Sequence, residues 1–153
     1  MNKNLKKVIS ATAALAISAS GVAAFAASYP DVADTASYKQ AVDELSALNI
    51  VNGYEDGTFQ PDKNVTRAEI TKMVVTALGD TVLNSAEAAK GRDTQFTDVP
   101  GTHWAAGYIS VGTSSQAGNF INGYSATEFG PEDNVTFAQA MKMLVGALGY
   151  TYY

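Results

Sequence analysis

The 153-residue chain contains no cysteine, a single histidine and only ten lysine and arginine residues. The lack of cysteine excludes disulfide frameworks, zinc fingers and cysteine nucleophiles. Three of the ten basic residues lie within the first seven positions. The rest of the chain therefore contains seven basic and fifteen acidic residues, which gives it a formal net charge of −8. Such an acidic surface repels nucleic acid and anionic lipid, so neither is an expected partner.

Long apolar runs are also scarce, and the first of them looks like a targeting signal. Three lysines precede an almost wholly apolar stretch over 8–26, which ends in Ala24-Phe25-Ala26. This pattern is typical of a secretory signal peptide, so we expect residues 1–26 to be removed and the mature chain to begin at Ala27. The alternative is a retained membrane anchor. No second apolar run is long enough to span a bilayer, so no membrane partner is expected after cleavage.

The remaining sequence contains an internal repeat. The stretch "YEDGTFQPDKNVTRAE" at 54–69 returns seventy residues later as "YSATEFGPEDNVTFAQ" at 124–139. The same shift relates "ALG" at 77–79 to "ALG" at 147–149, and "YPDV" at 29–32 answers "FTDV" at 96–99. A period of this length indicates an array of small units that bury their apolar faces against each other. We therefore divide the chain into repeat 1 (27–79), a polar linker that could contain one short helical turn (80–95) and repeat 2 (96–153).

Each repeat predicts two helices joined by a loop. Apolar residues at helical spacing predict an amphipathic helix over 36–48. Thr66 and Glu69 then form the sequence signature of a capping box, which opens a second helix that ends at Gly79. Thr136 and Gln139 form the same box in repeat 2, whose first helix should be short because "VGTSSQAGN" is rich in glycine and serine. The expected buried stripes are Ile70, Met73, Val74, Ala77 and Leu78 in repeat 1, and Ala140, Leu144, Ala147 and Leu148 in repeat 2.

Arg67 is the residue that capping does not explain. It stands at the first helical position, where the helix dipole makes a cation mildly unfavourable, so something negative should offset it. One interpretation is a surface salt bridge with Glu69 or Asp62. The other is that Arg67 and the exposed helix start together bind an anion, because a guanidinium offers a forked donor to carboxylate or phosphate.

These motifs resemble S-layer homology repeats. The resemblance rests on an aromatic-x-Asp-Val opening, a "GY-x-DGTF-x-P" loop and a "TRAE" helix start, and it covers about 29–149. It implies an all-α fold of tandem helix-loop-helix repeats that pack as prongs of a pseudo-trimeric spindle. It also implies an exported protein held non-covalently on a bacterial cell wall by a secondary cell-wall polysaccharide that carries acidic, pyruvate-ketal groups.

The resemblance assigns ligand binding to motif positions. In repeat 1 these positions are Asp31, Gly53, Tyr54, Thr66, Arg67 and Glu69, with the carboxylate of a pyruvate group as the anion for Arg67. Trp104 and Tyr124 are the candidates in repeat 2. Tyr54, Trp104 and Tyr124 could stack on sugar rings, although aromatic residues at such spacing are also common in cores. Repeat 2 has Phe137 in place of the arginine, so it is expected to be mainly structural.

Catalysis, metals and cofactors find little support in the sequence. His103 has no motif around it that would bring a nucleophile and an orienting acid together. The "NGYEDG" loop fails as a calcium loop, because Lys63 stands where a bidentate acid is required. We therefore expect no enzyme activity and no cofactor.

Three functions stay open: a wall-binding module, a structural surface-layer protein that oligomerises through its repeats, and the anchoring fragment of a larger surface enzyme. Because family modules usually have three repeats, we also expect two repeats to self-associate or to be marginally stable.

Overall fold

The computed structural model describes residues 28–114 and 120–150, and this part is helical. Its helices are α2 (Lys39–Ala47), α3 (Arg67–Ala77), α4 (Asp80–Ala89), α5 (Ala106–Gly112) and α6 (Phe137–Ala147). The described ranges contain no strand beyond an isolated antiparallel bridge between Thr66 and Asn134. The all-α prediction is therefore confirmed. The expected signal peptide lies outside the described residues, and no helix of 28–114 or 120–150 is long and apolar enough to cross a membrane.

Both predicted capping boxes form. The Glu69 amide donates to the Thr66 hydroxyl at 3.2 Å, and the Thr66 amide donates to the Glu69 carboxylate at 2.8 Å. Gln139 and Thr136 repeat this geometry at the start of α6 with the same two distances. Each box satisfies two backbone amides that a helix start leaves unpaired, which fixes where α3 and α6 begin.

The aromatic-x-Asp-Val opening of each repeat clamps the loop of that repeat. Asp31 accepts from the Phe59 amide at 2.9 Å and from the Gln60 amide at 2.6 Å. Asp98 accepts in the same way from Phe129 at 3.0 Å and Gly130 at 2.7 Å. The opening aromatic ring lies 5.4 Å from the loop phenylalanine in both repeats. The motif is thus an internal clasp, built twice.

The clasp of repeat 2 should make stability depend on pH. Burial raises the pKa of Asp98, but the amides of Gly130 and Phe129 and the charge of Arg67 together hold that pKa below its ordinary value. A lowered folded pKa means that the ionised clasp stabilises the fold above about pH 4, the unfolded value, and is lost as the pH falls further.

We therefore expect Asp98→Asn to lower the free energy of unfolding by about 1–2 kcal/mol at pH 7, because the amides lose a charged acceptor. The difference from the parent should shrink as the pH is lowered from about 4 towards 2. Urea unfolding at pH 7, 4 and 2.5 measures this. Glu128→Gln, at an exposed position, is the control. A gap between parent and Asp98→Asn that stays constant over this range would contradict the assignment.

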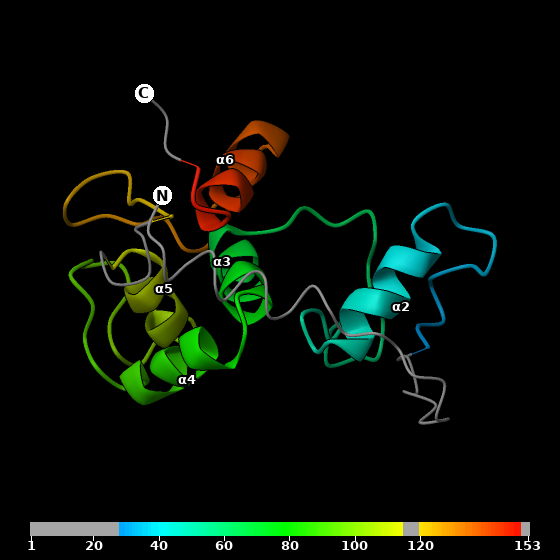
Figure 1. Cartoon of the computed structure of the whole chain (residues 1–153), viewed down its shortest axis with the longest axis horizontal. Helices are drawn as coiled ribbons and strands as arrows, with labels where there is room; N and C mark the ends of the chain where they lie inside the picture. Colours follow the sequence, from blue (N-terminus) through cyan, green and yellow to red (C-terminus); the bar gives the residue numbers. More distant parts are fainter. Residues whose placement is uncertain (1–27, 115–119, 151–153) are drawn as a thin grey trace.

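The packing divides unevenly between two clusters. The larger one joins α3, α4, α5 and α6 around Phe129, Ile109, Ile121, Val75 and Val99, each less than 2% exposed. The smaller one contains only Tyr29, Val32 and Val42, with Phe59 against them. Figure 1 shows α2 lying apart from the other four helices. The second helix of repeat 1, α3, is therefore packed into repeat 2. The first helix of repeat 1, α2, is left largely uncovered.

The segment 80–95, predicted as a polar linker, contains much more helix than the one short turn expected there. Residues 80–89 form the ten-residue helix α4, which packs against both α5 and α3. Ala86 on α4 is completely buried in the larger cluster, and the backbone at this point approaches Gly107 of α5 closely. Small residues on both helices allow that approach, a feature that a polar composition conceals.

The predicted buried stripes are also partly wrong. The buried residues of α3 are Arg67, Ala68, Thr71, Val74 and Val75. Ile70 and Met73 are only half-buried and Ala77 is exposed, so the inward face is rotated from the expected one. In α6 the inward residues are Met143 and Ala147, while Leu144 and Leu148 are 40% and 56% exposed. The short first helix predicted for repeat 2 is confirmed, since α5 has seven residues.

Candidate functional site

Two hollows lie on either side of the first turn of α3. We call the larger one the acidic groove, a shallow depression of about 590 Å³ between the two repeats. Its lining residues are Tyr54, Glu55, Asp56, Thr66, Glu69, Trp104 and Glu132. We call the smaller one, of about 200 Å³, the cationic cavity. It is lined by Arg67, Phe120, Ile121, Asn122, Gly123, Tyr124, Gln139, Lys142 and Met143.

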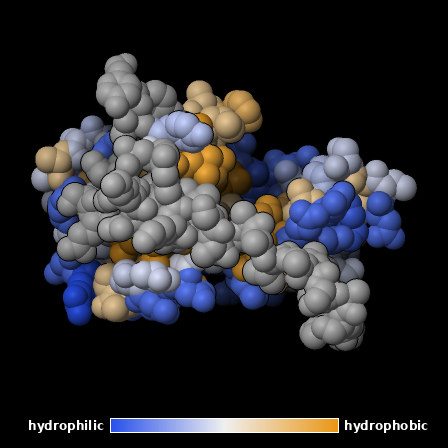
Figure 2. Space-filling model, in the orientation of Figure 1, coloured by the Kyte–Doolittle hydropathy of each residue, from blue (hydrophilic) through white to orange (hydrophobic). Residues whose placement is uncertain are grey.

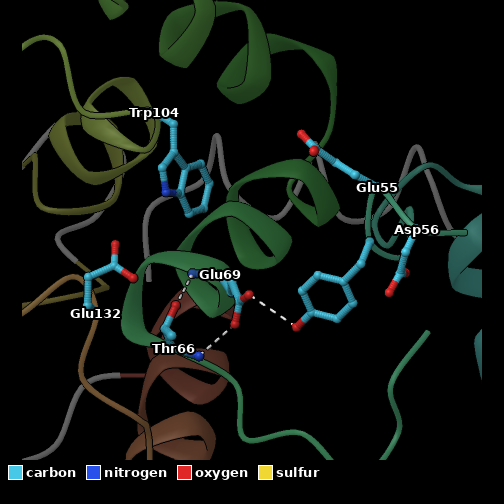
Figure 3. A pocket seen from close by; sticks show the side chains of 7 residues that line it. Glu55, Asp56, Thr66, Glu69, Trp104 and Glu132 are labelled. Carbon is cyan, nitrogen blue, oxygen red and sulfur yellow. Dashed lines mark hydrogen bonds between the residues drawn. The ribbon is translucent and has the colours of Figure 1, made fainter. Parts of the chain in front are cut away.

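The acidic groove combines carboxylates with an exposed indole ring. Figure 3 shows Trp104 and Glu132 on one side of Glu69 and Thr66, with Glu55 and Asp56 on the other. Glu69 accepts from the Tyr54 hydroxyl at 3.2 Å in addition to its capping bond. Four carboxylate side chains and no cation line the groove. It therefore suits hydroxyl donors and the apolar face of a sugar ring, and it disfavours an anion.

His103 is held in place beside this groove. Its Nδ1 accepts from the Ala105 amide at 3.1 Å, so the ring proton lies on Nε2 and can be donated to Glu132 at 3.2 Å. The imidazole also stacks on Trp104, with the ring centroids 5.8 Å apart. Both ring nitrogens are thus engaged in positioning the wall of the groove that carries Trp104.

Arg67 is buried, and the predicted exposed position at the start of the helix is wrong. Only 5% of this residue is exposed. Its Nε donates to the Phe129 carbonyl and one terminal nitrogen donates to the Asn122 carbonyl, both at 2.8 Å. The guanidinium also lies over the Tyr124 and Phe129 rings, 4.3 and 4.6 Å from their centroids. Neither predicted salt bridge, to Glu69 or to Asp62, is present in the described part of the chain. Arg67 instead ties repeat 1 to the loop of repeat 2.

One edge of this guanidinium still reaches solvent. Nη1 has no acceptor among the described residues. No buried side-chain nitrogen or oxygen of that part of the chain lacks a partner, so Nη1 must be accessible. Arg67 lines the cationic cavity together with Lys142 of α6. The cavity therefore offers unused guanidinium N–H groups, an ammonium and the Gln139 amide to an occupant.

The predicted site residues thus fall into three groups. Tyr54, Thr66, Glu69 and Trp104 line the acidic groove, while Arg67 and Tyr124 line the cationic cavity. Asp31 and Gly53 line neither. Asp31 is occupied by the loop clasp, and Gly53 has φ +67°, with a hypothetical Cβ 2.5 Å from the Tyr29 ring. Both residues therefore have a structural role in the loop of repeat 1.

Sequence reasoning missed Lys142 and the carboxylates of the acidic groove. Lys142 stands seventy residues after Lys72, and nothing in either copy distinguishes the two lysines. Their tertiary environments distinguish them. Lys142 lines the cationic cavity together with Arg67, whereas Lys72 lines neither hollow.

The family comparison agrees with the two-repeat architecture. A family model described as the S-layer homology domain matches residues 28–71 and 95–141. The chain belongs to this family. Each matched segment of the S-layer homology chain begins at or just before its clasp and runs into its capped helix, α3 or α6.

Three relatives of much greater length carry names of surface or anchoring proteins. A "Cell surface protein" of Thermoanaerobacter kivui is 40% identical over 97% of this chain and 19% of its own length. A "Surface layer protein" of Brevibacillus choshinensis is 36% identical over 97% of this chain and 13% of its own length. A "Cellulosome-anchoring protein" of Acetivibrio thermocellus is 31% identical over 76% of this chain and 25% of its own length. The chain thus spans about a quarter or less of these relatives, and no solved structure matches it. These similarities identify a secreted protein associated with the cell wall.

Proposed function

We propose that this chain anchors an exported protein to the bacterial cell wall by binding an acidic secondary cell-wall polysaccharide, with an acidic substituent such as a pyruvate ketal in the cationic cavity. The observation that carries the proposal is the convergence of Arg67 and Lys142 on one cavity in a chain that is otherwise strongly acidic. Two cations that line one cavity create a local attraction for anions that the net charge of the chain conceals.

The cavity has donors of the kind that a carboxylate requires. Two of the guanidinium hydrogen bonds are satisfied internally, which holds the plane of the group rigid while Nη1 remains available. A donor held in this way loses little side-chain entropy on binding. Charge-assisted hydrogen bonds from Arg67 and Lys142 would then supply affinity and select for the acidic group.

The acidic groove is suited to the neutral part of the same polymer. Trp104 is 49% exposed and offers an apolar face, and the surrounding carboxylates accept from sugar hydroxyls. Thr66 and Glu69 line the groove and Arg67 lines the cavity, so both hollows share the first turn of α3. A polysaccharide could therefore place an acidic unit on one side of this turn and a neutral unit on the other.

The test is binding of the mature chain to purified wall polysaccharide before and after mild acid removal of its ketal groups. Lys142→Gln should weaken binding to the untreated polymer by roughly tenfold, because one charge-assisted bond is lost. It should also reduce the salt dependence of binding. Lys142 is exposed, so folding should not change.

Lys72→Gln is the matched control, since it makes the same change at the equivalent position of repeat 1. It should leave affinity for the polymer unchanged. Equal binding of parent and Lys142→Gln, with no effect of ketal removal, would show that the cationic cavity does not receive the acidic group. No binding by the parent to either polymer would reject wall anchoring itself.

A further inference from the structure

We infer that Asn122 is a deamidation site, where slow conversion to aspartate or isoaspartate places a carboxylate in the cationic cavity. The chain contains the dipeptide Asn-Gly at 52–53 and at 122–123, which are equivalent positions of the two repeats. Asparagine is among the thermally labile residues. A following glycine makes it most reactive, because no side chain shields the glycine amide nitrogen from the asparagine side chain.

The folded loop leaves both reacting groups of this site free. Asn122 is exposed, and no described residue forms a hydrogen bond with its side-chain amide. No described residue accepts from the Gly123 amide. Both residues lie outside the helices of the described chain, so no helical hydrogen bond holds that amide in place. The reaction therefore does not require a helix to unfold.

Packing requires the glycine at position 123. A Cβ there would lie 2.5 Å from the Phe96 ring and 2.7 Å from the carbonyl oxygens of Ser125 and Glu128. The two carbonyl groups belong to the backbone of the same loop, so they cannot move aside as a flexible side chain does. The fold thus keeps, directly after Asn122, the residue that makes an asparagine most reactive.

The reaction needs water as its only co-reactant. The Gly123 nitrogen attacks the side-chain carbonyl carbon of Asn122, and its proton leaves with the displaced side-chain nitrogen as ammonia. Water then opens the resulting succinimide ring at either of its two C–N bonds. One opening gives aspartate, whose side chain carries the new carboxylate. The other gives isoaspartate, in which the main chain runs through the former side-chain carbon and the former backbone carbonyl becomes the carboxylate.

Either product places a carboxylate beside Arg67. Nη2 of Arg67 donates to the Asn122 backbone carbonyl at 2.8 Å, and both residues line the cationic cavity with Lys142. The new charge would offset one of the two cations of the cavity. Attachment of each molecule to the wall would then weaken with age, a consequence that rests on the proposed function.

Asn52 provides a matched site in repeat 1. It is exposed and precedes Gly53, whose amide also has no acceptor in the described part of the chain. Asn52 lines neither hollow. The surface of repeat 1 around α2 is largely hydrophilic, as Figure 2 shows. A new carboxylate at Asn52 should therefore leave the cationic cavity unchanged.

Peptide mapping of an aged sample tests the modification itself. We expect the folded parent chain, incubated in mildly alkaline buffer, to lose its side-chain amides at Asn122 and Asn52. Asn134, which is exposed but followed by valine, should keep its amide. A synthetic peptide of residues 120–126 gives the rate for the unfolded sequence. If Asn122 of the folded chain is unchanged when this peptide has fully converted, the inference is wrong.

The position of the new charge can be measured without a ligand. In an NMR titration, the carboxyl group introduced by Asn122→Asp should have a lower pKa than the one introduced by Asn52→Asp, because nearby cations stabilise its ionised form. Adding Lys142→Gln should reduce the difference. Equal pKa values for the two introduced groups would contradict a carboxylate in the cavity and overturn the inference.

Binding to the purified wall polysaccharide tests the consequence. Asn122→Asp should weaken binding about tenfold, whereas Asn52→Asp should not change it. Ageing should weaken binding by the parent but not by the Asn122→Gln chain, because the longer glutamine side chain forms a ring far more slowly and Asn52 still converts. Undiminished binding by a parent fully converted at Asn122 would overturn the inference. A fresh parent that does not bind would reject the proposed function, and the mapping and the titration would then decide the inference alone.

Discussion

Replacing Arg67 with alanine should lower the free energy of unfolding by about 3 kcal/mol and eliminate polysaccharide binding. The loss of stability follows from the two carbonyl groups that Arg67 satisfies at 2.8 Å. Phe129 is fully buried, so its carbonyl would lose its partner in the interior, which costs about 1–3 kcal/mol, and the contacts with two aromatic rings would be lost as well. Binding would suffer twice, through the lost donor and through the loosened cavity.

Urea unfolding followed by the fluorescence of Trp104, the single tryptophan, measures this prediction. Arg92→Ala is the control, because Arg92 is exposed and its removal should change stability by less than about 0.5 kcal/mol. Arg67→Lys should recover part of the stability, since an ammonium can reach one carbonyl but cannot bridge two as a planar fork does. An Arg67→Ala chain as stable as the parent would mean that Arg67 does not join the repeats.

Replacing Gly107 with alanine should be at least as damaging, by about 3 kcal/mol or more. A Cβ at this position would overlap the Ala86 carbonyl oxygen and would lie 3.3 Å from the Lys90 amide nitrogen. These are backbone atoms of α4 and of the residue that follows it, so the two helices would have to separate. Alanine is otherwise the better helix former by about 1 kcal/mol, so a loss of stability would report the clash alone.

Thermal unfolding followed by circular dichroism tests the Gly107→Ala prediction. Ser110→Ala, in the same helix and half-buried, should change the free energy of unfolding by less than about 0.5 kcal/mol. If α4 were the loose linker that its composition indicates, Gly107→Ala would be neutral or stabilising. The experiment therefore distinguishes a helix that belongs to the core from a tether.

Features that depend on neighbours in the sequence were predictable. The seventy-residue repeat, the capping boxes at Thr66 and Thr136 and the short α5 all follow from local spacing and composition. Each rests on contacts within a few residues or on a direct comparison of the two copies. The resemblance to S-layer homology repeats likewise needed only the motif residues, and the family match confirms it.

The candidate site was predicted only in part. The first turn of α3 was correctly singled out as unusual, and four predicted residues do meet in the acidic groove. The sequence could not show that the Asp31 carboxylate accepts hydrogen bonds from amides of its own loop, nor that Lys142 shares a cavity with Arg67. Both facts depend on which segments the fold brings together.

The sequence by itself determined what each repeat is: an opening, a loop and a capped helix in an acidic chain without cysteine. Only the tertiary structure decided which repeat each helix packs against. The helix begun by repeat 1 buries Arg67, Thr71 and Val74 in repeat 2, whereas the same helix of repeat 2 leaves its equivalent face open. The physical reason is that helical periodicity specifies that a face is apolar but not what covers it. A buried arginine is stable here because carbonyl groups more than fifty residues away accept its hydrogen bonds.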